Sequence, residues 1–309
     1  MEQTDRGALR NLIFSVILGI VLSRLSLGSA IMTVPVLMVC PRISQKSVKI
    51  GAFSAILAGT VIWTVVQNRV LLNTEYWPAI LVSLFLPVSF TIGSAVWAIG
   101  ADYSKSSMRK FFWASIPVFC MGTALGIYFA SDASLKIREI ITENVLYLFP
   151  SDVLSVDVTP MIKGVVDSMA LVFAPIAVML LALPIVISDV NLNRFDEDWQ
   201  YDFANMKLPD SYVWVFFGSW VCALLFRLVS GIPKWATVLA WNLALTMTAL
   251  YFIVGVSILV AFARRRTAAV TAGRIVFTVV LVCFIPFLNI AAAIALPLLG
   301  VLETWIKFR

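Results

Sequence analysis

The feature that most constrains this chain is the length of its apolar blocks, at about 11–26, 28–40, 48–66, 77–99, 111–130, 164–188, 211–230, 235–262 and 273–299. Most blocks approach the roughly 20 residues that a helix needs to cross the hydrocarbon core of a bilayer. Only 13% of the residues are charged, about half the share in an ordinary soluble domain. The sequence therefore predicts an all-α, polytopic transmembrane bundle in contact with lipid. We expect about 8–9 membrane segments in a single integral membrane domain over residues 1–309.

Three of these blocks are ambiguous. The first two meet at Leu27 and Gly28, so they form either a hairpin of short helices or one long broken helix. The last block contains Pro286 and Pro297 and is open to the same two interpretations, which leaves the side of the chain's end open. The start of the chain also resembles a signal peptide. Apolar residues resume at 31–39, however, which favours a retained membrane segment.

The charges of the connections indicate how the segments are oriented. Connections on one side of the predicted membrane hold fourteen Lys and Arg residues, and those on the other side hold seven. The fourteen are Arg6, Arg10, Arg42, Lys46, Lys49, Lys105, Arg109, Lys110, Arg194, Lys207, Arg264, Arg265, Arg266 and Arg274. Because cytoplasmic loops gather Lys and Arg, we place this side and the amino terminus in the cytoplasm. The net charge of +6 then reports topology, and we expect no nucleic-acid partner.

Two longer connections differ in character. Residues 133–149 place apolar side chains at helical spacing opposite charged ones. This pattern predicts an amphipathic helix that either lies on the outer surface of the membrane or packs over the mouth of the bundle. Residues 189–210 form a polar cytoplasmic loop with the acids Asp196, Glu197, Asp198 and Asp202. This cluster suits a solvated loop better than a cation site, because it lacks the D-x-D-x-D-G order of a calcium loop.

The absence of histidine removes most familiar catalytic designs. With no histidine in the chain, a Ser-His or Cys-His pair, a His-ligated metal and a His-bound haem cannot form. The cysteines Cys40, Cys120, Cys222 and Cys283 are far apart and lack C-x-x-C spacing, which favours packing roles. We therefore expect no enzyme, no cofactor and no metal. An intramembrane enzyme that uses Asp167 is the least favoured hypothesis.

Polar residues within apolar segments are candidates for function, because burying them in lipid is costly. Arg24, Lys163, Asp167 and Arg227 all fall near the outer leaflet in the predicted topology. We expect them to line an outward pocket whose guanidinium groups bind a carboxylate or phosphate of a small solute. The alternatives are that the basic side chains reach to water, or that Arg227 pairs with Asp167. Asn242 is expected either to bond between helices or to contact the solute.

Small residues recur one helical turn apart in two segments. Gly51, Ala55 and Gly59 lie on one predicted helix, and Gly122 and Gly126 lie on another. Small side chains let helix backbones approach closely in lipid, where association depends on packing. These faces therefore either pack inside the bundle or bind a partner membrane subunit.

The last third of the chain contains three ordered motifs: Lys207-Leu208-Pro209 before a helix, Asn242 followed by Tyr251-Phe252-Ile253-Val254-Gly255, and the closing run Leu299-Gly300-Val301-Leu302-Glu303-Thr304-Trp305-Ile306-Lys307-Phe308-Arg309. In this order they resemble the YybS-like family of predicted bacterial membrane proteins. The positions that carry the resemblance are Pro209, Asn242, Gly255, Gly300, Glu303, Trp305, Phe308 and Arg309. Val254, Glu303 and Lys307 depart from the family pattern, where Gln, Asp and a second acid are expected.

The resemblance implies a fold and a function. YybS-like proteins are similar to the substrate-binding S components of energy-coupling-factor transporters, which bind a small molecule from outside and dock on a separate ATP-hydrolysing module. The resemblance also implies a location in the bacterial cytoplasmic membrane. Because the chain has no G-x-x-x-x-G-K-[ST] phosphate-binding loop, a separate module would supply energy from ATP. The leading hypothesis is therefore a small-solute binding or transport subunit, and the alternative is a non-transporting membrane scaffold in envelope or division assembly.

Overall fold

The structure is a computed structural model that describes residues 2–25, 28–72, 74, 76–100, 107–147, 158–193, 196–229, 231–267 and 270–309. Helices make up 85% of it, and no strand occurs in these ranges. The all-α prediction is therefore confirmed.

Five of the described helices are long and apolar enough to cross a membrane: α3 (Lys46–Gln67), α5 (Pro78–Gly100), α6 (Ser107–Ala130), α9 (Phe173–Leu192) and α12 (Lys234–Arg266). Shorter apolar helices are α1 (Glu2–Leu22), α2 (Val34–Val39), α11 (Tyr212–Leu228), α13 (Ala272–Cys283) and α14 (Leu288–Leu302). The others are α4 (Arg69–Leu72), α7 (Leu135–Tyr147), α8 (Thr159–Ser168) and α10 (Glu197–Ala204), with single 3-10 turns at Gly28–Ala30, Cys40–Arg42, Asp132–Ser134 and Met169–Leu171. The count of about 8–9 segments is not confirmed, because several apolar blocks are divided into short helices.

The ambiguous blocks at both ends of the chain are pairs of short helices. Near the start, α1 and α2 pack against each other, and the Thr33 hydroxyl between them forms a 2.9 Å hydrogen bond with that of Ser94 on α5. Near the end, a turn separates α13 from α14, and Phe287 in this turn has a φ of 69°. Phe284 and Phe287 are 81% and 84% exposed. The interpretation as pairs of short helices is thus the one that the structure supports.

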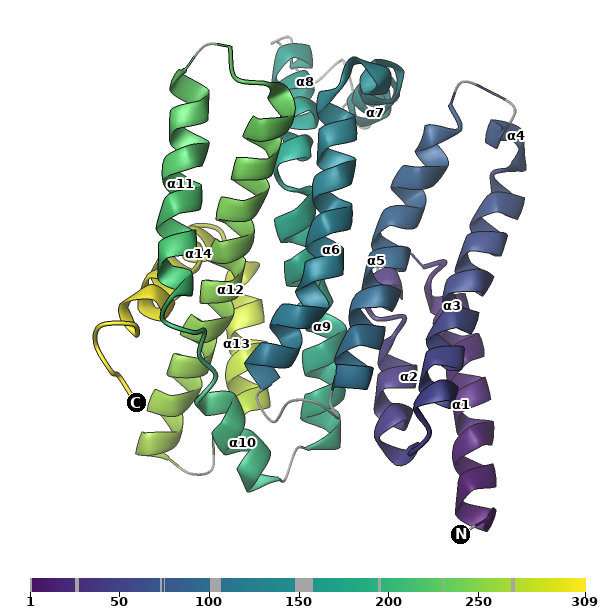
Figure 1. The fold of residues 1–309 in the computed structure, drawn as a ribbon, viewed down its shortest axis with the longest axis vertical. Coiled ribbons are helices and arrows are strands. Elements are labelled where there is room, and N and C mark those ends of the chain that lie inside the picture. Colours follow the sequence, from purple (N-terminus) through teal and green to yellow (C-terminus); the bar gives the residue numbers. More distant parts are fainter. Residues whose placement is uncertain are drawn as a thin grey trace.

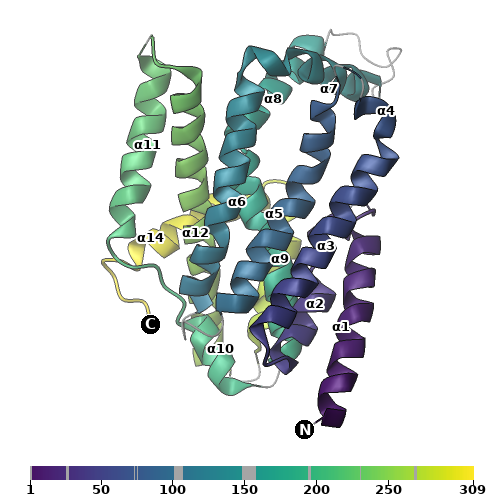
Figure 2. The ribbon, with the colours of Figure 1, turned by 45° about the vertical axis from the view of Figure 1, so that its right-hand side comes forward.

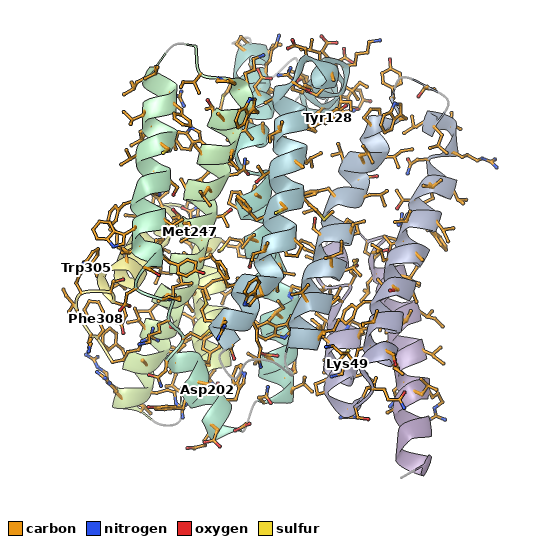
Figure 3. The ribbon with its side chains drawn as sticks, viewed as in Figure 1. Lys49, Tyr128, Asp202, Met247, Trp305 and Phe308 are labelled. Atoms are coloured by element: carbon orange, nitrogen blue, oxygen red, sulfur yellow. The ribbon has the colours of Figure 1, made fainter. Side chains whose placement is uncertain are left out.

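The basic connections gather at one end of the bundle. Figure 1 shows the starts of α1, α3 and α6 and the ends of α9 and α12 at this end, whereas α7, α8 and the α11–α12 turn lie at the other. In Figure 3, Lys49 and Asp202 lie toward the first end and Tyr128 toward the second. We call the first the basic end. The arrangement agrees with the predicted alternation of loops, and the membrane side that each end faces stays a prediction.

The long helix α12 forms the centre of the bundle. It packs against α6, α9, α11 and α14, and its Leu250, Tyr251 and Ile258 are at most 2% exposed. Figure 2 shows α14 crossing α12 about midway along its length. Because α12 is longer than a bilayer requires, the arginines at its end extend beyond its apolar part at the basic end.

The two longer connections contain helices. Within 133–149, Ile137 of α7 is 5% exposed and packs with Phe129, Ala170 and Val238, so α7 is packed over the end of the bundle. Within 189–210, the polar connection contains the short helix α10, on which the predicted acids are exposed. The Asp196 carboxylate accepts hydrogen bonds from the backbone N–H groups of Asp198 and Trp199, at 3.0 and 3.3 Å. The acids that follow favour a helix amino terminus.

Candidate functional site

Arg24 is held by α3 and not by a solute pocket. Its Nη2 donates to the Thr64 hydroxyl at 2.7 Å and to the Thr60 carbonyl at 3.1 Å, and its Nη1 donates to Gln67 Oε1 at 3.0 Å. The guanidinium also lies 6.0 Å from the centre of the Trp63 ring. These contacts fasten the end of α1 to α3 through the two terminal nitrogens of the guanidinium.

The other predicted ionisable residues do not converge either. Asp167 accepts a 2.7 Å hydrogen bond from Arg138 of α7, so the alternative pairing with Arg227 is wrong. Lys163 and Arg227 are exposed and have no ion-pair partner in the described part of the chain. The lining of a groove at this end includes Asp132 and Lys234, which form an exposed pair. The four residues predicted to line an outward pocket therefore do not form one.

Asn242 has the interhelical role that the sequence offered as its first alternative. It is fully buried at the point where the predicted segment 164–188 breaks into α8 and α9. Its Oδ1 accepts from the backbone N–H of Ala174 at 3.0 Å, and its Nδ2 donates to the carbonyls of Ala170 and Val238 at 2.9 Å. Backbone groups away from water must be paired. Asn242 supplies the hydrogen-bond partners for the Ala170 carbonyl and the Ala174 N–H at the break between α8 and α9.

Replacing Asn242 with leucine is expected to lower the free energy of unfolding by about 2 kcal/mol, because the Ala174 N–H and the Ala170 carbonyl lose their partner. Titration with a denaturing detergent in mixed micelles measures the change. Asn289→Leu is the matched control, since that side chain is exposed and bonds only next to itself, to the N–H of Ile290. Equal loss in both variants would contradict the role of Asn242.

The two groups of small residues differ in use. A Cβ on Gly122 would lie 2.5 Å from Ala174 Cα, and one on Gly126 would collide with the Ala170 carbonyl. A Cβ on Gly59 would meet Ile20 of α1 at 2.5 Å. These three glycines therefore pack within the chain, the first of the two predicted alternatives. Gly51 and Ala55 are exposed on α3, and no atom lies within 4 Å of a Cβ placed on Gly51.

The glycines in the closing motifs bring α12 and α14 into backbone contact. A Cβ on Gly255 would collide with the Leu296 carbonyl oxygen, and its distance to that carbonyl carbon would be 2.7 Å. A Cβ on Gly300 would collide in the same way with the carbonyl of Tyr251. The motif thus specifies a close helix crossing.

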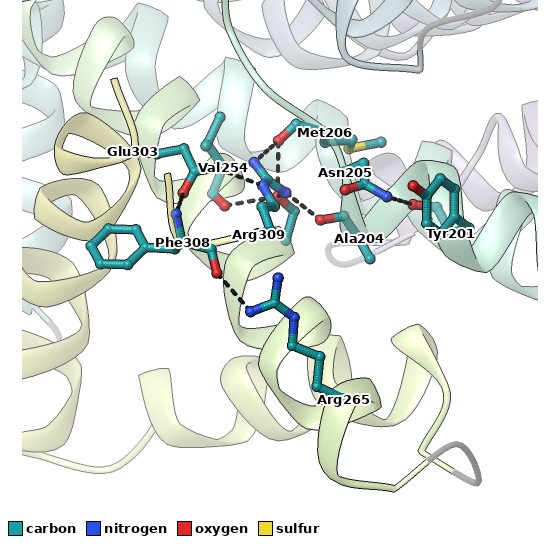
Figure 4. A network of polar contacts seen from close by, with 10 residues as sticks. Tyr201, Ala204, Asn205, Met206, Val254, Arg265, Glu303, Phe308 and Arg309 are labelled. Atoms are coloured by element: carbon teal, nitrogen blue, oxygen red, sulfur yellow. Dashed lines mark hydrogen bonds and ion pairs between the residues drawn. The ribbon is translucent and has the colours of Figure 1, made fainter. Parts of the chain in front are cut away.

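The last residues of the chain form a polar network, shown in Figure 4, that fastens α14 to the basic end. Arg309 Nε donates to Glu303 Oε1 at 3.0 Å, and the side chains are 7% and 11% exposed. The Arg309 guanidinium also donates to the carbonyls of Ala204 and Met206 and to the Ser257 hydroxyl. Burial lowers the pKa of Arg309, and the hydrogen bond and charge of Glu303 oppose that shift.

The aromatic residues of the same motif have smaller roles. Phe308 donates its backbone N–H to Glu303 at 3.2 Å, and its carbonyl accepts from Arg265 at 2.9 Å. Trp305 is 57% exposed and lies against Phe217, and Pro209 is exposed in the connection before α11. Most of the motif residues at the end of the chain therefore stabilise the fold.

A cavity of about 380 Å³ lies toward the basic end, and the sequence did not indicate it. Its walls come from α5, α6, α9, α10, α12 and α13 and are apolar except at Asp189 and Asn191. Its lining includes Ile187 of α9 and Phe277 of α13, which are 37% and 63% exposed. The cavity therefore opens on the apolar flank of the bundle between these helices. We call it the apolar cavity.

The wall contains one acid, Asp189 on α9. Lys110 on α6 lies beside the wall, with its Nζ 6.0 Å from the centre of the ring of Trp97, which lines the cavity. The predicted segment 164–188 stops one residue before Asp189, so the sequence placed this acid in a loop. Its position within an apolar wall needs the three-dimensional structure.

A second hollow, of about 560 Å³, adjoins the apolar cavity. Met108 of α6 lines both, and Met206 of the cavity precedes Lys207 of the second hollow. The second hollow is lined by Arg109, Phe112, Trp113, Lys207, Leu208, Pro209, Asp210 and Tyr212 in addition to Met108. We call it the basic groove.

Comparison with known proteins adds no relative to this description. No protein-family model, curated protein or solved structure matches the chain. The resemblance to YybS-like membrane proteins stays a prediction that rests on residues 207–309. The function is therefore argued from the geometry of the apolar cavity and its surroundings.

Proposed function

We propose that this protein is a membrane-embedded binding subunit for a small molecule with a large apolar part. The observation that supports this most strongly is the apolar cavity. Its volume of about 380 Å³ falls within the roughly 300–1,000 Å³ of ligand pockets, which are also mostly apolar with a few polar groups. Its opening on an apolar flank suits a molecule that enters from the bilayer.

We retain the predicted role in transport and place the proposed binding site in the apolar cavity. The cavity lies toward the basic end, whereas the sequence placed the solute near Arg24, Asp167 and Arg227. We propose that a separate ATP-hydrolysing module supplies the energy, in line with the absence of a phosphate-binding loop. The exposed small residues Gly51 and Ala55 of α3 provide a face against which a partner helix can pack closely.

Filling the apolar cavity tests the proposal. Ala182 of α9 and Val280 of α13 line it from opposite helices. We expect Ala182→Phe and Val280→Phe each to weaken binding of a lipophilic ligand at least about tenfold, which corresponds to about 1.4 kcal/mol. Native mass spectrometry from nanodiscs identifies the ligand that co-purifies and compares its occupancy between variants.

The control for these variants is Ala293→Phe on the exposed side of α14, outside the lining of the cavity. It adds the same ring and is expected to leave occupancy unchanged. Unfolding of ligand-free protein checks that the variants fold, because a ligand selective for the folded state adds stability only when bound. Equal occupancy in wild type and both filled variants would refute the proposal.

The exposed face of α3 also supports a second function, a non-transporting scaffold in envelope or division assembly. Crosslinking from a cysteine placed at Gly51 separates the two functions. Recovery of an ATPase pair with a transmembrane coupling protein favours transport. Recovery of envelope-assembly proteins alone favours the scaffold.

A further inference from the structure

The charges of the basic groove narrow the chemical class of the ligand. Arg109 and Lys207 are exposed in its lining, and neither has an ion-pair partner in the described ranges. Asp210 is the one acid among the lining residues. The adjoining apolar cavity contributes one acid, Asp189, and no basic residue. The lining of the basic groove itself thus has an excess of positive charge, with two basic residues and one acid.

The position of the groove on α6 adds to this preference. Arg109 and Met108 lie in the first turn of this helix, which runs from Ser107 to Ala130. Backbone N–H groups at a helix amino terminus carry partial positive charge and favour a nearby anion. Trp113 and Tyr212 also line the groove, and these residue types are common at the level of lipid headgroups. The groove therefore suits an anionic headgroup at the membrane interface.

We infer that the ligand is an anionic amphiphile, with its hydrocarbon chain in the apolar cavity and its phosphate-type headgroup in the basic groove between Arg109 and Lys207. This inference rests on the proposed function, because it assumes that the apolar cavity binds a ligand. Met108 lines both hollows, which places them next to each other, and the inference requires one molecule to pass beside this side chain. Arg109 supplies the paired donors that suit phosphate oxygens, and Lys207 supplies a second charge.

Four probes separate the contributions of chain and headgroup. Dodecyl phosphate, dodecanol and dodecyltrimethylammonium share one chain and differ in charge, and inorganic phosphate has the anion without a chain. Each is titrated against the protein in nanodiscs of zwitterionic phosphatidylcholine, with thermal unfolding and native mass spectrometry as readouts. We expect dodecyl phosphate to bind at least about tenfold more tightly than the other two chains, and inorganic phosphate to give no stabilisation at the same concentration.

Two charge variants locate the headgroup. Arg109→Gln with Lys207→Gln is expected to remove the preference for dodecyl phosphate and to leave dodecanol binding unchanged. Arg42→Gln with Arg266→Gln removes the same charge from exposed positions near the basic end that line neither hollow. This control is expected to keep the preference, with any general attraction of anions to the basic end reduced equally in both double variants.

The possible outcomes distinguish failure of the anionic-amphiphile inference from failure of the proposed binding function. If the three chains bind alike in wild type and Ala182→Phe weakens all of them, the inference is overturned and the proposed function stands. If no probe binds in a way that Ala182→Phe changes, both fail. If inorganic phosphate stabilises the protein as strongly as dodecyl phosphate, the groove binds anions independently of the cavity and the inference is overturned. Retention of the preference after loss of Arg109 and Lys207 overturns it as well.

Discussion

Replacing Glu303 with leucine is expected to lower the free energy of unfolding by about 3–5 kcal/mol, the loss typical when one partner of a buried ion pair is removed. The Arg309 side chain is 7% exposed, so its charge would remain largely away from water without a counter-ion. The hydrogen bonds from Arg309 to Ala204, Met206 and Ser257 do not neutralise that charge. Detergent-induced unfolding in mixed micelles measures the loss.

Two further variants control this experiment. Lys307→Met removes one charge from an exposed side chain of the same tail and is expected to change stability by less than about 0.5 kcal/mol. Glu303→Leu combined with Arg309→Met is expected to cost less than the sum of the single changes, because no unpaired charge remains. Additive losses would show that the two side chains do not act as a pair.

Replacing Gly255 with alanine is expected to destabilise the protein by about 3 kcal/mol, at the upper end of the usual cost of overpacking. The added Cβ would collide with the carbonyl of Leu296. The backbone of α14 would have to move, since a carbonyl group lacks the freedom of a flexible side chain. The movement would also displace Glu303, which follows α14 directly.

Gly51→Ala is the matched control, because it makes the same change in a long apolar helix. No atom lies within 4 Å of the new Cβ, and alanine favours a helix over glycine by about 0.5–1 kcal/mol. The control is therefore expected to be neutral or slightly stabilising. A similar loss at Gly51 and Gly255 would show that the α12–α14 crossing is not the cause.

The predicted outward pocket shows what membrane depth alone cannot determine. Distance from the nearest charged loop indicates depth in the membrane, and equal depth predicts that Arg24, Asp167 and Arg227 lie together. Depth does not say which helices are neighbours or which way a side chain faces. Arg24 lies against α3, Asp167 against α7, and Arg227 on an exposed part of α11, so no common pocket results.

Asn242 and the glycines show an intermediate case. An amide in an apolar helix must find a partner, and small residues spaced by one turn favour close packing. Both requirements could be predicted from residue type and spacing. The partners themselves, the broken segment beside Asn242 and the α14 backbone beside Gly255, depend on how helices distant in sequence pack.

The sequence by itself determined that the chain is helical, that its surface suits lipid, and that the basic connections share one end. These properties are local, because block length, composition and loop charge each depend on neighbouring residues. Tertiary structure alone decided the division of the end blocks, the Glu303–Arg309 pair and the apolar cavity. A cavity is the space left between helices, here from six parts of the chain, and no local pattern encodes the shape of that space.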